Sequence, residues 1–225
     1  MWRSSKTRVV ALTVLLVISA ARAYPQSPGQ DDDDVQSWND LQLTVPMGKH
    51  IDFTTMGTAR FGDNVSRAVD GRYMIGFVLK PNKAIAITPF YWYINSRNAR
   101  GLYKVENQLN LRASYKFPTK GFGLSHRSQY EYRMRSPANS WRYRAQMTID
   151  KQLPEKWIAG LRIFAWDEVF YDSLTKRFSR NRIAAGISKA LTKQLSLDVY
   201  YMRQNDGTSH PGDLNVIWTA WKVRM

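Results

Sequence analysis

The 225-residue sequence contains no cysteine and only three histidines, His50, His126 and His210. Without cysteine, the chain can form neither a disulfide framework nor a thiolate metal site. The histidines are scattered and show none of the close spacings that zinc ligands need. A glycine-rich phosphate loop and a paired-carboxylate motif are also missing. We therefore expect no bound metal and no cofactor.

Long hydrophobic runs are absent too, except near the N-terminus. There the apolar stretch Val9–Ala20 follows a short basic segment, residues 3–8, and precedes Ala21-Arg22-Ala23. This order is typical of a cleavable secretion signal. The stretch is too short for a helix that crosses a bilayer, which needs about 20 residues. We predict a signal peptide over residues 1–23 and a mature chain that begins near Tyr24; the alternative is an uncleaved membrane anchor.

Residues 24–34 contain Pro, Gly, Ser and Gln, end in the run Asp31–Asp34, and show no periodicity. This composition is typical of a disordered acidic arm. A calcium site is the alternative. However, adjacent aspartates in an extended chain point in alternate directions and lack the spacing of known calcium loops. The sequence therefore predicts a solvated arm over 24–34, followed by one folded domain over 35–225.

The segment Gly121–Arg135 alternates two kinds of side chain. Phe122, Leu124, His126, Ser128, Tyr130, Tyr132 and Met134 share one face, and Ser125, Arg127, Gln129, Glu131, Arg133 and Arg135 share the other. Because a β-strand has a period of two, one face meets an apolar environment and the other a polar one. The segment is far longer than a soluble strand of about five or six residues, which favours a membrane-spanning strand.

The same pattern recurs in eleven segments. They are residues 38–45, 51–61, 72–79, 84–94, 104–117, 121–135, 141–153, 157–169, 180–191, 194–205 and 217–225. We predict an all-β fold, an antiparallel transmembrane β-barrel of 10–12 strands. Bacterial single-chain barrels normally have an even number of strands. We therefore expect either that the arm before Trp38 adds a strand or that one segment is not a separate strand.

The connections alternate in predicted length. Short turns occur at 46–49, 81–83, 118–120, 154–156 and 192–193, and longer polar loops occur near 62–70, 95–101, 136–140, 171–179 and 206–213. Outer-membrane barrels have short periplasmic turns and longer external loops, whereas a soluble sandwich with Greek-key crossovers is not expected to keep this alternation. The last strand then ends on the periplasmic side.

Aromatic residues gather near the predicted strand ends, as at Trp92–Tyr93 and Tyr200–Tyr201. Such rings form girdles at the head-group level of membrane barrels; core packing in a soluble sandwich is the alternative. We predict the outer membrane of a bacterium as the location. The expected partners are outer-membrane lipid and lipopolysaccharide, together with the barrel assembly machinery during biogenesis.

Several short motifs resemble those of a known bacterial family. They are Trp38-Asn39-Asp40, Glu131-Tyr-Arg, Trp141-Arg-Tyr-Arg, Asp167-Glu168-Val-Phe170, Arg180-Asn181-Arg182-Ile183-x-x-Gly186 and Leu197-Asp198-x-Tyr200-Tyr201-Met202. Together they are similar to the family called domain of unknown function 2490, over roughly residues 38–225. The resemblance implies an outer-membrane barrel of undetermined function and supplies no catalytic residues. Met225 departs from the phenylalanine that usually ends such barrels.

The chain is strongly basic, with 33 Lys and Arg against 18 Asp and Glu and a net charge of +15. Such an excess is common in nucleic-acid-binding proteins. Here, however, the basic residues recur singly on the polar faces of successive strands and form no helix or patch. A positive barrel interior or contact with anionic lipid explains the charge better, and we expect no nucleic-acid partner.

One group of three residues has the arrangement of a possible catalytic site. His126 and Ser128 lie two residues apart on the lipid-facing side of their strand, and Asn139 begins the neighbouring strand with the same parity. This is similar to outer-membrane phospholipase A, in which a His activates a Ser and an Asn orients the His. The phospholipase pattern continues Ser-Asn-Gly, whereas Gln129 and Tyr130 follow here. We therefore expect a non-enzymatic protein, with lipid hydrolysis as a minor alternative.

The polar faces carry the second set of candidate residues. The charged side chains expected to face the lumen, meaning the barrel interior, are Arg112, Arg127, Glu131, Arg133, Arg142, Arg144, Arg162, Glu168 and Arg182. In one interpretation, paired charges fill a narrow lumen and the protein is a structural, largely plugged barrel. In the other, excess arginine lines a small anion-preferring pore. The first is favoured, and the sequence leaves both open.

Overall fold

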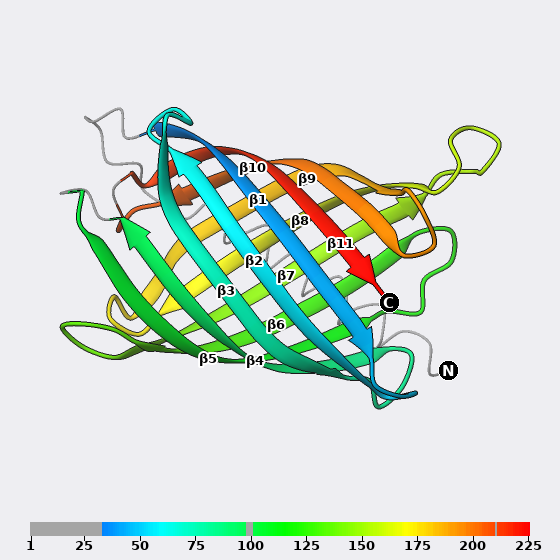
Figure 1. The fold of residues 1–225 in the computed structure, drawn as a ribbon, viewed down its shortest axis with the longest axis horizontal. Helices are drawn as coiled ribbons and strands as arrows, with labels where there is room; N and C mark the ends of the chain where they lie inside the picture. Colours follow the sequence, from blue (N-terminus) through cyan, green and yellow to red (C-terminus); the bar gives the residue numbers. More distant parts are fainter. Residues whose placement is uncertain (1–32, 98–100, 210) are drawn as a thin grey trace, which may run out of the picture. The chain divides into compact units, whose positions relative to one another are not determined.

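The computed structural model describes residues 33–97, 101–209 and 211–225, which form a closed barrel of eleven strands (Figure 1). The all-β barrel expected from the alternation is thereby confirmed. The strands are β1 (Asp33–Pro46), β2 (Ile51–Gly62), β3 (Arg67–Leu79), β4 (Ile85–Arg97), β5 (Tyr103–Lys116), β6 (Gly123–Met134), β7 (Ser140–Gln152), β8 (Leu161–Asp172), β9 (Arg177–Ala190), β10 (Leu195–Asp206) and β11 (Asp213–Arg224). No helix in these ranges has the length and hydropathy to cross a bilayer.

The barrel closes through a parallel pair of strands. Consecutive strands pair antiparallel, but β1 pairs with β11 in parallel, from Asp33 opposite Asp213 to Thr44 opposite Arg224. Figure 1 shows the two arrows side by side, pointing the same way. The eleven strands lie within the predicted range of 10–12. Only the expectation of an even number is wrong for the described residues, since a parallel closure accommodates an odd number of strands.

The barrel also starts earlier than expected. Asp33 and Asp34 belong to β1 and not to a disordered arm. The Asp34 carboxylate accepts hydrogen bonds from the backbone N–H groups of Asp63 (3.1 Å) and Asn64 (2.8 Å). Asp63 and Asn64 both have positive φ angles, so Asp34 holds a left-handed turn between β2 and β3. The signal peptide and the rest of the arm, residues 1–32, lie outside the described residues.

The expected alternation of short turns and longer loops is wrong. Only residues 63–66 separate β2 from β3 and only 173–176 separate β8 from β9, whereas 153–160, at the end expected to have short turns, is a longer connection. Parts of the polar segments expected to be loops are strand ends instead, such as residues 67–70 in β3 and 177–179 in β9. The polar side chains of these strand ends that face the barrel interior, such as those of Asp70 and Ser179, are mostly buried.

The two faces of the barrel wall differ sharply in polarity. Outward-facing apolar side chains such as Leu41, Leu109 and Ile183 are more than half exposed. By contrast, the inward-facing carboxylates of Glu131 and Glu168 are only 1% exposed. The barrel is therefore apolar outside and polar inside, which is the reverse of a soluble domain.

The interior also holds two apolar clusters, on different parts of the wall. The first consists of Trp38, Ala184, Met202, Leu214 and Val216, and the second of Met74, Phe90, Trp92 and Ile94. The second cluster explains why residues 84–94 are apolar on both faces. The lumen wall is therefore not uniformly polar, and its charged residues lie beside aromatic and aliphatic surface.

Two inward-facing glycines give space to aromatic residues on adjacent strands. A Cβ at Gly76 would lie 2.4 Å from the Cβ of Phe90, and a Cβ at Gly186 would lie 2.1 Å from the Cβ of Tyr200. The cross-strand register pairs each glycine directly with its aromatic residue. Glycine at these positions lets the neighbouring backbones approach closely.

Candidate functional site: an arginine-rich lumen

The barrel encloses a cavity of about 750 Å³, to which every one of the eleven strands contributes side chains. The cavity reaches Leu174 and Thr208 near one end of the barrel and Asp150 and Lys222 near the other. The structure places all nine charged residues expected to face the lumen on its lining: Arg112, Arg127, Glu131, Arg133, Arg142, Arg144, Arg162, Glu168 and Arg182.

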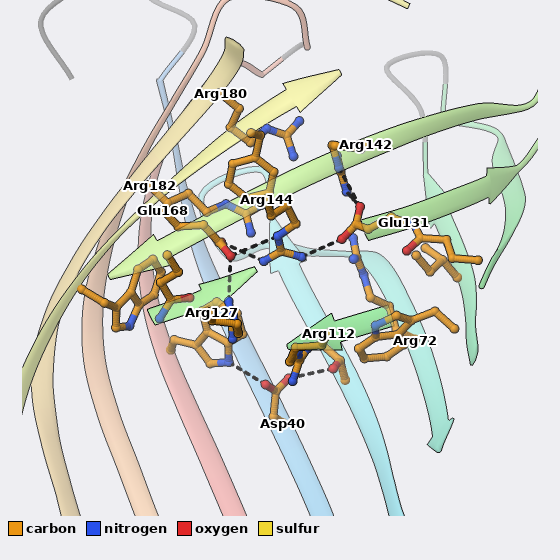
Figure 2. A pocket seen from close by; sticks show the side chains of 18 of the residues that line it. Asp40, Arg72, Arg112, Arg127, Glu131, Arg142, Arg144, Glu168, Arg180 and Arg182 are labelled. Carbon is orange, nitrogen blue, oxygen red and sulfur yellow. Dashed lines mark hydrogen bonds and ion pairs between the residues drawn. The ribbon is translucent and has the colours of Figure 1, made fainter. Parts of the chain in front are cut away.

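Two buried glutamates, Glu131 of β6 and Glu168 of β8, organise arginines of β6 and β7. The Arg142 guanidinium lies 2.6 Å from Oε2 of Glu131, and Nη2 of Arg127 lies 2.7 Å from Oε1 of Glu168. Arg144 lies between the two carboxylates. It donates through Nη1 to Glu131 (2.9 Å) and through Nε and Nη2 to both oxygens of Glu168 (3.0 and 2.7 Å). Figure 2 shows this chain of contacts. Charge-assisted, bidentate pairs of this kind are the strongest polar contacts in proteins.

A single aromatic ring lies at the centre of the arginines. The guanidinium carbons of four arginines lie within 6 Å of the Phe170 ring centre: Arg144 at 4.6 Å, Arg182 at 4.9 Å, Arg142 at 5.3 Å and Arg180 at 5.6 Å. Phe170 is itself fully buried. Because the face of an aromatic ring attracts cations, Phe170 partly offsets the repulsion among these like charges.

Two of the lumen arginines have no carboxylate partner among the described residues. Arg112 donates through Nε to Oε1 of Gln129 (2.9 Å), and Arg182 donates through Nε to Oε1 of Gln204 (2.8 Å). Arg112 lies over the Phe90 ring at 4.8 Å. Both guanidinium groups are thus held by neutral partners, which leaves their charges uncompensated.

The remaining expected residues lie in separate pairs. Arg133 contacts Glu106 at 2.6 Å and Asp172 at 3.3 Å, while Arg162 makes a loose contact with Asp150 at 3.8 Å and donates to Ser188 at 3.4 Å. The expected set of nine therefore consists of one connected network, two unpaired arginines and two peripheral ion pairs.

Besides Arg135, which the alternation already puts on the polar face of its strand, the expected set omitted three arginines that also line the cavity, Arg60, Arg72 and Arg180. Arg60 lies 3.5 Å from the ring centre of Trp38, Arg72 pairs with Asp70 at 2.5 Å, and Arg180 donates to Asp206 at 2.6 Å. Alternation along β2, β3 and β9 carries the signal that could have found them, because each lies on the same face as its strand's other inward residues.

The candidate catalytic residues come together only in part. Nε2 of His126 lies 2.9 Å from Oγ of Ser128, which in turn lies 2.8 Å from the Tyr143 hydroxyl. Asn139, however, does not orient this histidine. Its amide donates to the Tyr132 hydroxyl (3.3 Å) in the connection after β6, and the other ring nitrogen of His126 faces the Met147 sulfur. The expected contact between His126 and Asn139 is therefore not made, since the register aligns His126 with Met147.

Two solved structures share similarity with the barrel. The NanC porin in a rhombohedral crystal form has a TM-score of 0.48 and 11% identity, over 84% of this chain and 96% of that chain. An anion-selective porin from Comamonas acidovorans has a TM-score of 0.39 and 11% identity, over 80% of this chain and 54% of that chain. The present chain thus spans about half the length of the second porin.

No protein of curated function matches the sequence. A family match, by contrast, extends over residues 35–215, which is most of the chain and nearly all of the barrel. It confirms the resemblance that the short motifs indicated. The chain belongs to the family described as protein of unknown function, DUF2490.

Proposed function

We propose that the protein is an outer-membrane barrel whose lumen admits small anions. The membrane part of the proposal is supported by the outer wall, where large apolar side chains are exposed on every strand. A continuous apolar surface of this kind is unstable in water and marks contact with a membrane or a partner. The strands are 12–14 residues long, and a tilted transmembrane strand needs about 9–11 residues.

The observation that carries the anion proposal is the charge of the cavity lining. Twelve basic side chains and seven acidic side chains line it. Rings of basic side chains favour anions in pores, and low-dielectric walls strengthen the field. Asp70 and Asp206, outside the lining, pair with Arg72 and Arg180, and basic side chains remain in excess after these pairs are included. An anion entering the lumen compensates this excess.

The contacts within the lumen run along the wall. Across residues 33–97, 101–209 and 211–225, each hydrogen bond and ion pair between lumen side chains joins strands that are at most two positions apart in the barrel, as Arg127 of β6 and Glu168 of β8 do. The network therefore lines one side of the cavity without tying opposite walls together. This favours a permeable lumen over the structural, plugged barrel that the paired charges also allow.

Planar-bilayer recordings in a KCl gradient test the proposal. We expect discrete current steps and a reversal potential of the sign that chloride preference produces. Arg112→Glu should shift the reversal potential toward cation preference, because it replaces an uncompensated positive charge with a negative one. The matched control is Arg67→Glu, on an exposed side chain paired with Asp63 and outside the cavity lining, which should leave the potential unchanged. An absence of steps at high protein load would support the plugged structural barrel instead.

A lipid hydrolase is a second candidate, favoured only by the contact between His126 and Ser128. A serine nucleophile needs a histidine held in one tautomer by a third group, and a methionine sulfur is a poor orienting partner. We therefore propose that the protein is not an enzyme. Phospholipid hydrolysis by the purified protein that disappears in Ser128→Ala would overturn this.

A further inference from the structure

We propose that the arginine cluster of the lumen, in which the guanidinium groups of Arg112 and Arg182 lack a carboxylate partner, binds a small oxyanion with two negative charges. The inference rests on the proposed function in one respect, since the lumen must be open to solutes. It goes further in naming the class of solute and the side chains that bind it.

Arg182 has no carboxylate partner because the carboxylate directly opposite it, that of Glu168, already binds two other arginines. The register places Arg182 of β9 directly opposite Glu168 of β8. The oxygens of Glu168 accept hydrogen bonds from Arg127 and Arg144, and no guanidinium nitrogen of Arg182 lies within 4.0 Å of a Glu168 oxygen. Arg182 is only 6% exposed, so a positive charge remains without a counter-ion in a largely desolvated place.

Arg112 is in the same situation on β5. Arg112 lies opposite Gln129, while Arg127 lies opposite Ser114. The two arginines are therefore diagonal neighbours on adjacent strands, about 7–8 Å apart at their backbones. The charges of Arg127 and Arg144 repel Arg112, and each acts on it more strongly than the attracting charges of Glu168 and Glu131 do. An anion near Arg112 and Arg127 would relieve this repulsion.

Two glutamines bind only the Nε atoms of Arg112 and Arg182, so that the terminal nitrogens stay available for a ligand. Gln129 accepts only from Nε of Arg112, and it is itself held by its amide, which donates to Glu131 at 2.7 Å. Gln204 accepts only from Nε of Arg182. Within the described parts of the chain, the terminal nitrogens of Arg112 and Arg182 have no hydrogen-bond partner. Each guanidinium is thus oriented by a neutral side chain, and its free donors line the cavity (Figure 2).

The net charge of the arginine cluster indicates which class of ligand it binds. Arg112, Arg127, Arg142, Arg144 and Arg182 carry five positive charges, and Glu131 and Glu168 carry two negative charges, so a doubly charged anion compensates the cluster better than a halide does. The planar fork of a guanidinium matches the paired oxygens of a sulfate, phosphate or carboxylate. The cavity of about 750 Å³ can hold either a free oxyanion or a small organic molecule that carries one.

Tryptophan fluorescence of the folded protein in detergent micelles tests the site without requiring conductance. Trp92, Trp166 and Trp218 line the cavity and report on its contents. The probe is sulfate, titrated against chloride at constant ionic strength. We expect a saturable change for the wild type and a weakening of at least roughly tenfold in Arg182→Gln and in Arg112→Gln, because each loses hydrogen bonds to a charged group.

Arg67→Gln is the control, because Arg67 is exposed, pairs with Asp63 and lies outside the cavity lining; it removes one positive charge elsewhere and should bind sulfate as the wild type does. If Arg182→Gln does not give the heat-modifiable gel mobility of a folded barrel, Arg112→Gln carries the test. Saturable binding without conductance would support the site and overturn the pore. Conductance without saturable sulfate binding, equal saturation by chloride, or unchanged binding in both variants would overturn the site.

Discussion

The guanidinium carbon of Arg144 lies 4.6 Å from the ring centre of Phe170, while the nitrogens of the same guanidinium bind both Glu131 and Glu168. Arg144 therefore meets an aromatic face and two carboxylates at once. Since Phe170 also contacts three further arginines, this pair of residues joins the charged wall of the lumen to its aromatic part.

Replacing Phe170 with leucine should loosen the arginine cluster. The variant loses four cation–π contacts, each worth about 0.5–1 kcal/mol, although the arginines regain some hydration. We expect the free energy of unfolding to fall by about 2 kcal/mol, measured by urea denaturation in detergent. Phe61→Leu is the control, because Phe61 faces outward and should change this free energy by less than about 0.5 kcal/mol.

Glu168→Gln should destabilise the protein and strengthen its anion preference. Arg127 and Arg144 would lose a buried counter-charge, which typically costs about 3 kcal/mol or more, and the lumen would gain one net positive charge. Urea denaturation and the reversal potential report the two effects separately.

Asp150→Asn makes the same change in lumen charge at a more exposed pair, whose contact with Arg162 spans 3.8 Å. Its cost should stay under about 1 kcal/mol. Equal destabilisation by Glu168→Gln and Asp150→Asn would show that the buried network stabilises the fold no more than the exposed ion pair does.

Gly186→Ala should be poorly tolerated. The added Cβ would lie 2.1 Å from the Cβ of Tyr200 and 2.4 Å from the Val199 carbonyl oxygen, so the strands must move apart at a cost of about 1–3 kcal/mol. Gly71→Ala is the matched control on a strand, where a Cβ meets nothing within 4 Å. The refolding yield and the urea midpoint of unfolding are measured for both variants. A midpoint equal to that of the wild type for Gly186→Ala would contradict the close approach of Gly186 to Tyr200.

Single cysteines can report the orientation of the barrel, because the sequence contains none of its own. Ser66 lies in the turn between β2 and β3, and Lys49 lies at the opposite end, between β1 and β2; both are exposed. With the last strand ending on the periplasmic side, a membrane-impermeant maleimide should label Ser66→Cys on intact cells. It should label Lys49→Cys only after the outer membrane is permeabilised. The reverse pattern would invert the orientation, and labelling of both on intact cells would refute insertion.

Strand periodicity made much of this barrel predictable. In β6, alternation alone separates His126 and Ser128 on the outside from Arg127 and Glu131 on the inside, because the period of a strand does not depend on its partner. The family resemblance depended on the same local patterns and could be recognised from short motifs.

Features that depend on distant partners could not be predicted. The pairing of β1 with β11 joins the two ends of the domain, and no local pattern encodes its direction. Asp34 belongs to an acidic run, yet its position in β1 is determined by the turn at Asp63 and Asn64. Likewise, whether an arginine has a carboxylate partner depends on the cross-strand register and on which other arginines bind the same carboxylate. Arg182 lies opposite Glu168, but the Glu168 carboxylate binds Arg127 and Arg144 instead.

The parallel seam between β1 and β11 has a consequence for how the polypeptide is threaded. In a barrel built from whole hairpins, the number of strands is even, and the chain ends at the mouth of the barrel where it began. A short peptide could then join the two ends of the chain into a circle. Here the chain makes one more pass in one direction than in the other, and Asp33 and Met225 lie at opposite mouths. A direct connection from Met225 back to Asp33 would have to run the length of the barrel, and duplication of hairpins alone cannot generate this strand number.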